Sequence, residues 1–433
     1  MSIDYQKLRI EGIYRQNEAG DLMQRIKLPA GVLSVEQAGK ICAIAEQFSN
    51  GRLHLTTRGS IEIHWLRPEC LATVQRMLAA VGLTSRGACG GAVRGISCSS
   101  SAGPGFARVP ELAARLQRHF TGNPHFEGLP KKFKLAVESG YAGSRHLIQD
   151  LSLVLVGSDA EGSLYDLWLA GGLGREPREA FLYRQRVPEA QLLPIIEAVV
   201  GLYRALGTPG KRLKHLLAQL GEASLRQEIE SRIEGQAPCS LLDGVAKNPL
   251  TVEPQGAPRV EVVFFAGELD CGQMRQIAAL ATSFSDGYLL VTSDQNLALY
   301  PPTPQARTAL VAALGKAGFL DDQRFRQVPF RVCPGSHECR LGLAPTREIA
   351  AQVLASLGPV GQSLDWAISG CLNSCAQPQL AAAGIIAVAN RPDADGQRQP
   401  AFALYRRQGS GFGQPVADNL TRELLLEAVA ALG

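Results

Sequence analysis

Apolar and polar positions follow two different periods near the N-terminus, and each period predicts a different element. Residues 36–48 place apolar side chains at helical spacing, and Asn50-Gly51 has the composition of a turn. Residues 53–63 alternate between apolar and polar side chains, which predicts a half-buried strand. A second helix is expected over residues 68–81. This stretch therefore predicts a small α+β unit of helices around a strand pair.

The same pattern returns later in the chain. Residues 30–83 align without a gap with residues 266–319, at a constant offset of 236 residues (266 − 30). Phe48-Ser49-Asn50-Gly51, for example, faces Phe284-Ser285-Asp286-Gly287. An ungapped match of this length is too long to be explained by chance similarity. The repeat predicts two α+β half-domains that pair about a pseudo-twofold axis.

Each copy is followed by a longer segment, so the repeat also predicts the domain organisation. We expect a half-domain over residues 1–83, a longer domain over 84–247, the second half-domain over 248–322 and a cysteine-bearing domain over 323–433. A chain of 433 residues with 45% apolar and 19% charged side chains is typical of a soluble globular protein with several domains.

Charge and hydropathy exclude several partners. The net charge of +4 is too small for a general nucleic-acid binder. The most apolar run, residues 192–202, contains a glutamate and a proline, which predicts a packed helix and no membrane span. The N-terminal residues carry no apolar core of a secretory signal, so we expect a reducing, cytoplasmic location.

Four cysteines in the last quarter of the chain form two close pairs, Cys333 with Cys339 and Cys371 with Cys375. Thiolates that converge from two tight loops can hold a [4Fe–4S] cluster. Structural zinc is the alternative, but the five-residue gap in the first pair is wide for it. We interpret the remaining cysteines as small core residues; they are Cys42, Cys70, Cys89, Cys98, Cys239 and Cys271.

Residues 129–137 predict a strand with lysines at alternate positions. Lys132 and Lys134 then share one face, whereas Phe133 and Leu135 point to the core. Two ammonium groups on one face repel each other, which an anion between them would explain. A solvent-facing edge strand that uses lysines to prevent aggregation explains the pattern equally well.

The cysteine spacing, the duplicated half-domain and the Leu-Pro-x-Lys-Phe-Lys strand together resemble the sulfite and nitrite reductases that use sirohaem and a [4Fe–4S] cluster. The resemblance covers nearly the whole chain. It implies an α+β fold of duplicated ferredoxin-like half-domains, each followed by a sirohaem/Fe–S-type α/β domain. The implied activity is the six-electron reduction of sulfite to sulfide or of nitrite to ammonia.

The resemblance also implies roles for individual residues. Cys333, Cys339, Cys371 and Cys375 would hold the cluster, with Cys375 also bridging to the sirohaem iron. The anionic substrate would bind among four basic residues: Arg58, Arg94, Lys132 and Lys134. Further contacts to sirohaem are implied for Thr56, Arg212, Lys214, Gln295 and Asn296. Sirohaem carries several carboxylates, so a buried site for it needs cations.

Some positions depart from the reductase pattern. Gly59 stands where the family usually has glutamine, and Gly95 where it has asparagine. A neighbouring branch, the precorrin-3B synthases of cobalamin biosynthesis, shares the half-domain and the cysteine spacing and acts on a tetrapyrrole. That branch typically lacks the second strand lysine, so Lys134 favours the oxyanion reductase. A non-catalytic carrier of the cluster or the tetrapyrrole is the third hypothesis.

Electrons are expected from a separate protein. The chain has no second cysteine cluster, and its glycine-rich residues 409–413 are followed by no dinucleotide-binding unit. We therefore expect a ferredoxin or a flavoprotein subunit as donor.

Overall fold

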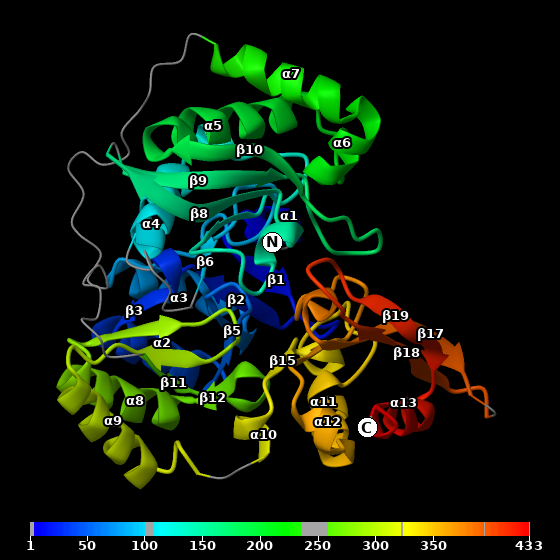
Figure 1. The fold of residues 1–433 in the computed structure, drawn as a ribbon. Helices are drawn as coiled ribbons and strands as arrows, with labels where there is room; N and C mark the ends of the chain where they lie inside the picture. The colour runs from blue at the N-terminus through cyan, green and yellow to red at the C-terminus, as the bar shows by residue number, and fades with distance from the viewer. Residues whose placement is uncertain are drawn as a thin grey trace.

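The computed structural model describes residues 4–99, 108–160, 162–234, 259–321, 324–393 and 395–432. In Figure 1 the two half-domains lie side by side at the lower left, the domain after the first copy lies above them, and the C-terminal domain lies at the lower right. The predicted domain boundaries at 247/248 and 322/323, and Cys239, fall outside the described residues. Within the described ranges, no helix is both long enough and apolar enough to cross a membrane.

The two half-domains exchange a strand. The first contains α1 (Tyr5–Ile10), β1 (Ile13–Arg15), β2 (Leu22–Ile26), β3 (Val32–Ser34), α2 (Val35–Phe48), β4 (Arg52–Leu55), β5 (Ile61–Leu66) and α3 (Leu71–Ala79). The second contains β11 (Val260–Val262), β12 (Glu268–Asp270), α8 (Cys271–Phe284), β13 (Tyr288–Val291), β14 (Leu297–Leu299) and α9 (Pro304–Lys316), followed by α10 (Arg324–Gln327). Strand β12 pairs with β4, and β3 pairs with β13. The sheet orders are therefore β1-β2-β5-β4-β12 and β11-β14-β13-β3.

This exchange is symmetric, because β3 and β12 occupy equivalent positions of the repeat. The local signals repeat as well: Ser34 and Gln37 form a capping box at the start of α2, and Asp270 and Gln273 form the same box at the start of α8. Helices α2 and α8 pack against each other, and one apolar core runs through both half-domains. The duplicated fold predicted from the sequence is confirmed.

The alternating segment at 53–63 differs from its prediction. It forms two antiparallel strands, β4 and β5, joined by a tight turn in which Gly59 has φ 61°. Its polar residues are buried too: His54, Glu62 and His64 are each about as inaccessible as the core. The prediction of a half-buried strand was wrong because the C-terminal domain covers the second face, with Glu338 lying next to His64.

The two longer domains share one topology. The first contains β6 (Ser97–Cys98), α4 (Arg108–Phe120), β7 (Leu135–Glu138), β8 (Leu151–Asp159), β9 (Gly162–Leu169), β10 (Phe181–Pro188), α5 (Glu189–Leu206), α6 (Leu213–Leu220) and α7 (Glu222–Ile233). The C-terminal one contains β15 (Phe330–Val332), α11 (Thr346–Ser356), α12 (Pro359–Gln362), β16 (Trp366–Ser369), β17 (Ala383–Pro392), β18 (Arg398–Arg406), β19 (Gln414–Leu420) and α13 (Arg422–Ala430).

In both domains two parallel strand pairings are followed by two antiparallel ones, in the orders β6-β7-β8-β9-β10 and β15-β16-β17-β18-β19. The predicted strand at 129–137 begins only at Leu135, although Phe133 forms a parallel bridge with Val93 just before it. Phe133 and Leu135 are fully buried as expected. Lys132 and Lys134 therefore lie at the entrance of β7.

Candidate active site

The four paired cysteines lie in loops that follow the parallel strands β15 and β16. Cys333 comes directly after β15, and Cys371 follows β16 after one glycine, Gly370. The amide of Gly370 donates to Sγ of Cys333 at 3.2 Å, which holds the two loops together. A side chain at Gly370 would meet Thr346 at 3.0 Å and Gly335 at 3.1 Å, so the close approach requires glycine there.

The four thiols lie near enough to one another for each to feel the charge of its neighbours. Burial raises the pKa of Cys333, and the neighbouring Cys375 and Cys371 raise it further. Burial likewise raises the pKa of Cys339 to about 11, again with contributions from Cys375 and Cys371. Metal binding stabilises thiolates and removes this penalty. The donor set therefore fits the predicted [4Fe–4S] cluster, and Cys375 is its exposed member.

The four predicted basic residues come from separate segments and lie on the side of Cys375. Arg58 belongs to the turn between β4 and β5, Arg94 precedes β6, and Lys132 and Lys134 precede β7. A thiolate at Cys375 raises the pKa of both lysines, whereas Arg94 lowers that of Lys132 and Arg58 lowers that of Lys134. These mutual effects place cysteine and cations around one region.

This cluster carries positive charge without a matching carboxylate. Arg58 donates to the Gly95 carbonyl at 2.6 Å and to Gln149 at 3.3 Å, and Arg94 donates to the carbonyls of Ala88 and Gly90. Among the described residues, none of the four forms a salt bridge. Arg94 is buried and the other three are partly buried. Charge without a counter-ion is costly in such a setting, so the arrangement suits an anion.

The pKa values of the cluster reflect the same lack of counter-charge. Burial lowers the pKa of Lys132 to about 8, with Cys375 opposing and Arg212 assisting this shift. Burial also lowers the pKa of Lys134 well below its usual range, and Arg58 adds to the effect. The pKa of Arg58 falls to about 9, first through burial and then through Arg94. A bound anion would raise these pKa values again, because it favours the charged forms.

Two contacts join the loop that carries Cys375 to the first half-domain. Thr57 Oγ1 donates to the carbonyl of Cys375 at 2.9 Å, and the Gln377 amide lies 3.5 Å from the Thr57 carbonyl. The turn that carries Arg58 is thereby fixed to the loop that carries Cys375. No feature of the sequence singled out Thr57 over its neighbour Thr56.

Arg212 and Lys214, predicted as sirohaem contacts, are engaged within the protein. Arg212 donates to both carboxylate oxygens of Asp150, at 2.7 and 3.2 Å. Lys214 Nζ donates to the carbonyls of Gly172, Leu173 and Glu176. Both are buried beside the basic cluster, and Arg212 acts on Lys132 and Lys134 by charge.

Three other predicted sirohaem contacts also have internal partners. Thr56 Oγ1 accepts the amides of Arg58 and Ser60, which closes the turn. The Gln295 side chain donates to the carbonyls of Leu55 and Val332 at 2.9 Å each and accepts the Val332 amide at 2.7 Å. Asn296 is bound by the Phe264 amide and by Glu261. The structure gives Gln295 and Asn296 bridging roles, and their side-chain amides are occupied.

The structure adds one basic residue that the sequence did not reveal. Lys27, at the end of β2, is 2% exposed and donates to Thr121 at 2.7 Å. Burial lowers its pKa to about 7, and Arg94 and Arg58 lower it further. The sequence did offer one indication that Lys27 is buried, because it lies between two apolar residues, Ile26 and Leu28. Lys27 extends the cluster on its inner side.

Comparisons with known proteins agree with this architecture. The family model "Nitrite/Sulfite reductase ferredoxin-like half domain" matches residues 14–81 and 258–317, and "Nitrite and sulphite reductase 4Fe-4S domain" matches residues 102–236. The chain belongs to the nitrite and sulfite reductase family. Members of this family are oxidoreductases that use a [4Fe–4S] cluster and sirohaem, so these are the cofactors of the chain. The matched segment 102–236 contains no cysteine, and the paired cysteines lie in the C-terminal domain of the same topology.

Individual relatives cover most of the chain. Sulfite reductase [ferredoxin] 2 of Mycolicibacterium paratuberculosis is 28% identical over 92% of this chain and 76% of its own length. The chloroplastic ferredoxin–nitrite reductase of Zea mays is 28% identical over 93% of this chain and 76% of its own. The structure of the Mycobacterium tuberculosis NirA protein superposes with a TM-score of 0.83 at 24% identity, covering 99% of this chain and 87% of that one. The NirA likeness supports the fold.

Proposed function

We propose that the chain reduces sulfite to sulfide or nitrite to ammonia, a six-electron reaction, at sirohaem coupled through Cys375 to the [4Fe–4S] cluster. The observation that carries the proposal is the set of four cations without carboxylate partners beside an exposed cluster cysteine. A compact oxyanion supplies the negative charge that these residues lack. Sulfite reductases and nitrite reductases among the relatives support both substrates.

The basic residues divide into two chemical roles. Arg58 and Arg94 are fixed by bonds to backbone carbonyls, which suits positions that hold an anion in one orientation. Lys132, with a pKa of about 8, carries a proton at neutral pH that it can release to a departing oxygen. Lys134 provides a second donor on the same face. The bound sirohaem and cluster supply the electrons.

The buried cations behind this face support the same centre. Arg212 faces Asp150 and Lys214 faces backbone carbonyls, and the charge of Arg212 acts on Lys132 and Lys134. We propose that they stabilise the carboxylates of sirohaem through this field, together with Lys27. Thr56 closes the turn that presents Arg58.

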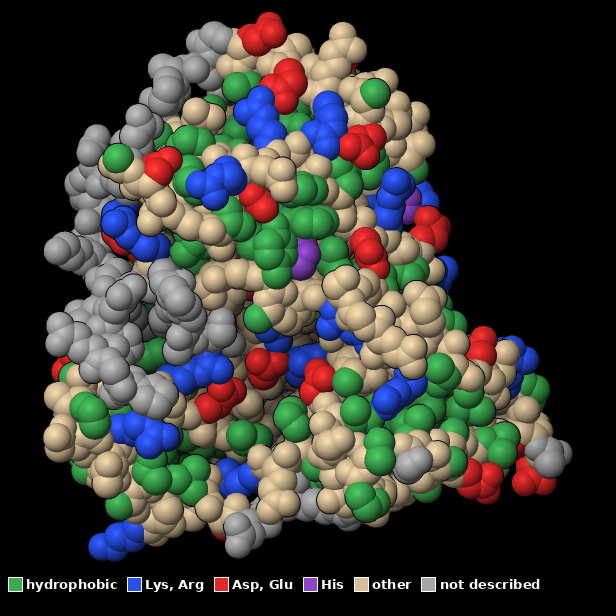
Figure 2. Space-filling view, viewed as in Figure 1, with side chains coloured by type: hydrophobic (Ala, Val, Ile, Leu, Met, Phe, Trp, Pro, Cys, Tyr) green, Lys and Arg blue, Asp and Glu red, His purple; other side chains and the backbone are tan. Residues whose placement is uncertain are grey.

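The electron donor is proposed to be a ferredoxin, with a flavoprotein as the other candidate class. The names of the sulfite and nitrite reductases that resemble the chain specify ferredoxin. Figure 2 shows basic and acidic side chains mixed over the face in view.

The convergence of the basic residues favours catalysis over a carrier role, because a carrier needs no ring of cations around an open coordination position. The precorrin-3B synthase alternative is not favoured by the relatives.

Turnover tests the proposal directly. The holoprotein, isolated without oxygen, is assayed for oxidation of reduced methyl viologen with sulfite and, separately, with nitrite. We expect anion-dependent oxidation and formation of sulfide or ammonia. A holoprotein that carries both cofactors, reduces neither anion and converts a precorrin would overturn the proposal and favour the tetrapyrrole oxygenase.

A further inference from the structure

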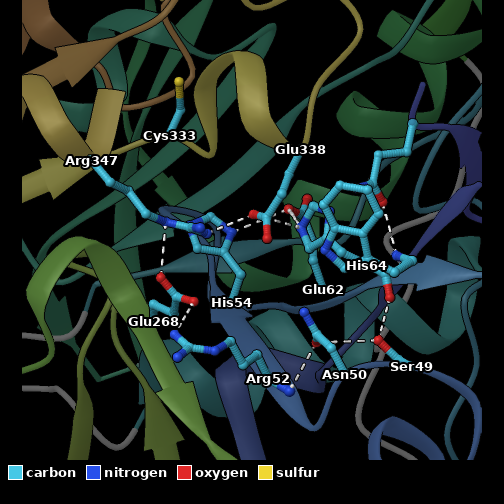
Figure 3. A network of polar contacts seen from close by, with 12 residues as sticks. Ser49, Asn50, Arg52, His54, Glu62, His64, Glu268, Cys333, Glu338 and Arg347 are labelled. Atoms are coloured by element: carbon cyan, nitrogen blue, oxygen red, sulfur yellow. Dashed lines mark hydrogen bonds and ion pairs between the residues drawn. The ribbon is translucent and has the colours of Figure 1, made fainter. Parts of the chain in front are cut away.

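A second cluster of chemically active side chains lies beside the cysteine loops, on the strands β4 and β5. His54, Glu62 and His64 are buried, with side chains 4%, 4% and 6% exposed. Figure 3 shows the three side chains facing one another, with Glu338 reaching them from the C-terminal domain. Their nearest ligand atoms all lie within 4.8 Å of one another. None of them has a role in the oxyanion site.

His64 has unsatisfied polar atoms in this setting. Within the described parts of the chain, neither of its ring nitrogens has a hydrogen-bond partner. Nε2 instead lies 3.5 Å from Glu62 Oε2 and 3.9 Å from Glu338 Oε2. An imidazole buried without partners costs free energy. A group that fills the space between the histidine and the carboxylates would remove that cost.

The spacing of the ligand atoms fits a metal ion. His54 Nδ1 is 3.2 Å from Glu62 Oε2, which in turn is 3.5 Å from His64 Nε2. Around an ion with bonds of about 2.1 Å, neighbouring ligand atoms lie roughly 3.0 Å apart in octahedral and 3.4 Å apart in tetrahedral geometry. Two imidazoles and a carboxylate are a donor set for divalent first-row transition ions.

We propose that His54, Glu62 and His64 bind one divalent first-row transition-metal ion, such as Zn²⁺ or Fe²⁺, with Glu338 beside the site. The site is separate from the cysteine cluster and goes beyond the proposed reduction of oxyanions.

The surrounding residues orient these ligands. Arg25 donates to Glu62 Oε1 at 2.5 and 2.7 Å, which leaves Oε2 to face the two histidines. The side-chain nitrogen of Gln295 lies 3.2 Å from Nε2 of His54. Arg347 donates to Glu338 at 2.6 Å. Partners of this kind are typical of metal sites, where they fix the ligating atoms.

The position of Glu338 gives the ion a structural consequence. Glu338 directly precedes the predicted cluster cysteine Cys339, whereas the three ligands belong to the first half-domain. Because Glu338 Oε2 lies 3.9 Å from His64 Nε2, an ion bound by the three ligands would lie next to the loop of residues 333–339. The competing explanation is a network of hydrogen bonds and ion pairs without a metal, in which Nε2 of His64 pairs with Glu62 and Glu338 at 3.5 and 3.9 Å.

Zinc is the probe for the test. Crystals of the holoprotein are soaked with Zn²⁺, and anomalous difference maps are recorded above and below the zinc edge; calorimetric titration with Zn²⁺ gives the affinity. The variant His64→Gln is compared with His337→Gln, which removes an exposed histidine 3.0 Å from Glu348. Iron and sulfide are counted in each protein.

We expect one zinc peak between His54, Glu62 and His64, and unchanged affinity in His337→Gln. Loss of an outer partner typically weakens metal binding about 10- to 100-fold, so removing a ligand in His64→Gln should weaken it by at least about 100-fold with cluster iron retained. Absence of the peak, or equal affinity in both variants, would overturn the proposal. If His64→Gln does not fold, the wild-type map decides alone.

Discussion

At the residue scale, the proposed site depends most on Lys132 and Lys134. Both precede β7 on one face, while Phe133 between them is buried in the core. The alternation was visible in the sequence and predicted this geometry. The sequence alone could not predict that this face lies near Arg58 and Cys375, because these residues come from distant segments of the chain.

Lys134→Gln should weaken substrate binding. Loss of one charge-assisted contact typically costs about 1.5–3 kcal/mol, which corresponds to a roughly 10- to 150-fold higher KM for sulfite or nitrite. The rate should fall as well, because a proton donor is lost. Steady-state assays at matched sirohaem content measure both effects. Lys131→Gln, which alters an exposed neighbour, should change KM little, and equal effects from the two variants would refute the assignment.

Lys27 makes stability depend on pH. Its pKa is lowered from 10.5 to about 7, so between these values the unfolded chain binds more protons at this residue than the folded chain. Its contribution to stability therefore rises with pH, by about 1 kcal/mol from pH 7 to pH 8. In Lys27→Met this rise should disappear relative to the wild type.

Thermal melting at pH 7 and pH 8 measures the difference between wild type and Lys27→Met. Lys7→Met, at a side chain that is 88% exposed, serves as control and should follow the wild type. If the melting temperature rises equally in Lys27→Met and in the wild type between pH 7 and pH 8, Lys27 does not titrate in this range and stays charged in the folded protein.

At the scale of elements, the turns that follow β4 and β13 carry the site. Both copies of the repeat close a turn with a residue at positive φ, Gly59 in the first and Gln295 in the second. The repeat predicted their equivalence. The sequence could not show that the Gln295 side chain crosses to β15, since that contact joins segments of two domains.

Gln295→Ala should therefore destabilise the protein and loosen the cysteine loop. The substitution leaves the Val332 amide and the carbonyls of Leu55 and Val332 without their side-chain partner. Each buried unpaired group costs about 1–3 kcal/mol. The melting temperature should fall, and the cluster should be released faster on dilution into a chelator.

Gln414→Ala removes an exposed glutamine of β19 and provides the control. If Gln295→Ala melts and loses iron like Gln414→Ala, the bridge to β15 does not support the cluster loop.

At the scale of the molecule, the proposed active site is assembled from both halves of a duplicated chain. The first copy and its following domain supply Arg58, Arg94, Lys132 and Lys134, and the domain after the second copy supplies the cysteines. The equivalent of Arg58 is Asp294, which pairs with Arg145 and Arg331. The gapless repeat and the cysteine spacing made the fold and cofactors predictable. The strand exchange was not predictable, because nothing in the three-residue sequences of β3 and β12 indicates which strand each one pairs with.

The most direct test of the account is the magnetic coupling between cluster and sirohaem, measured by Mössbauer and electron paramagnetic resonance spectroscopy. The wild type should contain about five iron atoms per chain, four in the cluster and one in sirohaem, with the two centres coupled. Cys375→Ser should lose the coupling and most activity, whereas Cys70→Ser, at a half-buried thiol of the first half-domain, should keep both. Identical spectra for the two variants, or zinc in place of iron and sulfide, would contradict a single coupled centre built on Cys375.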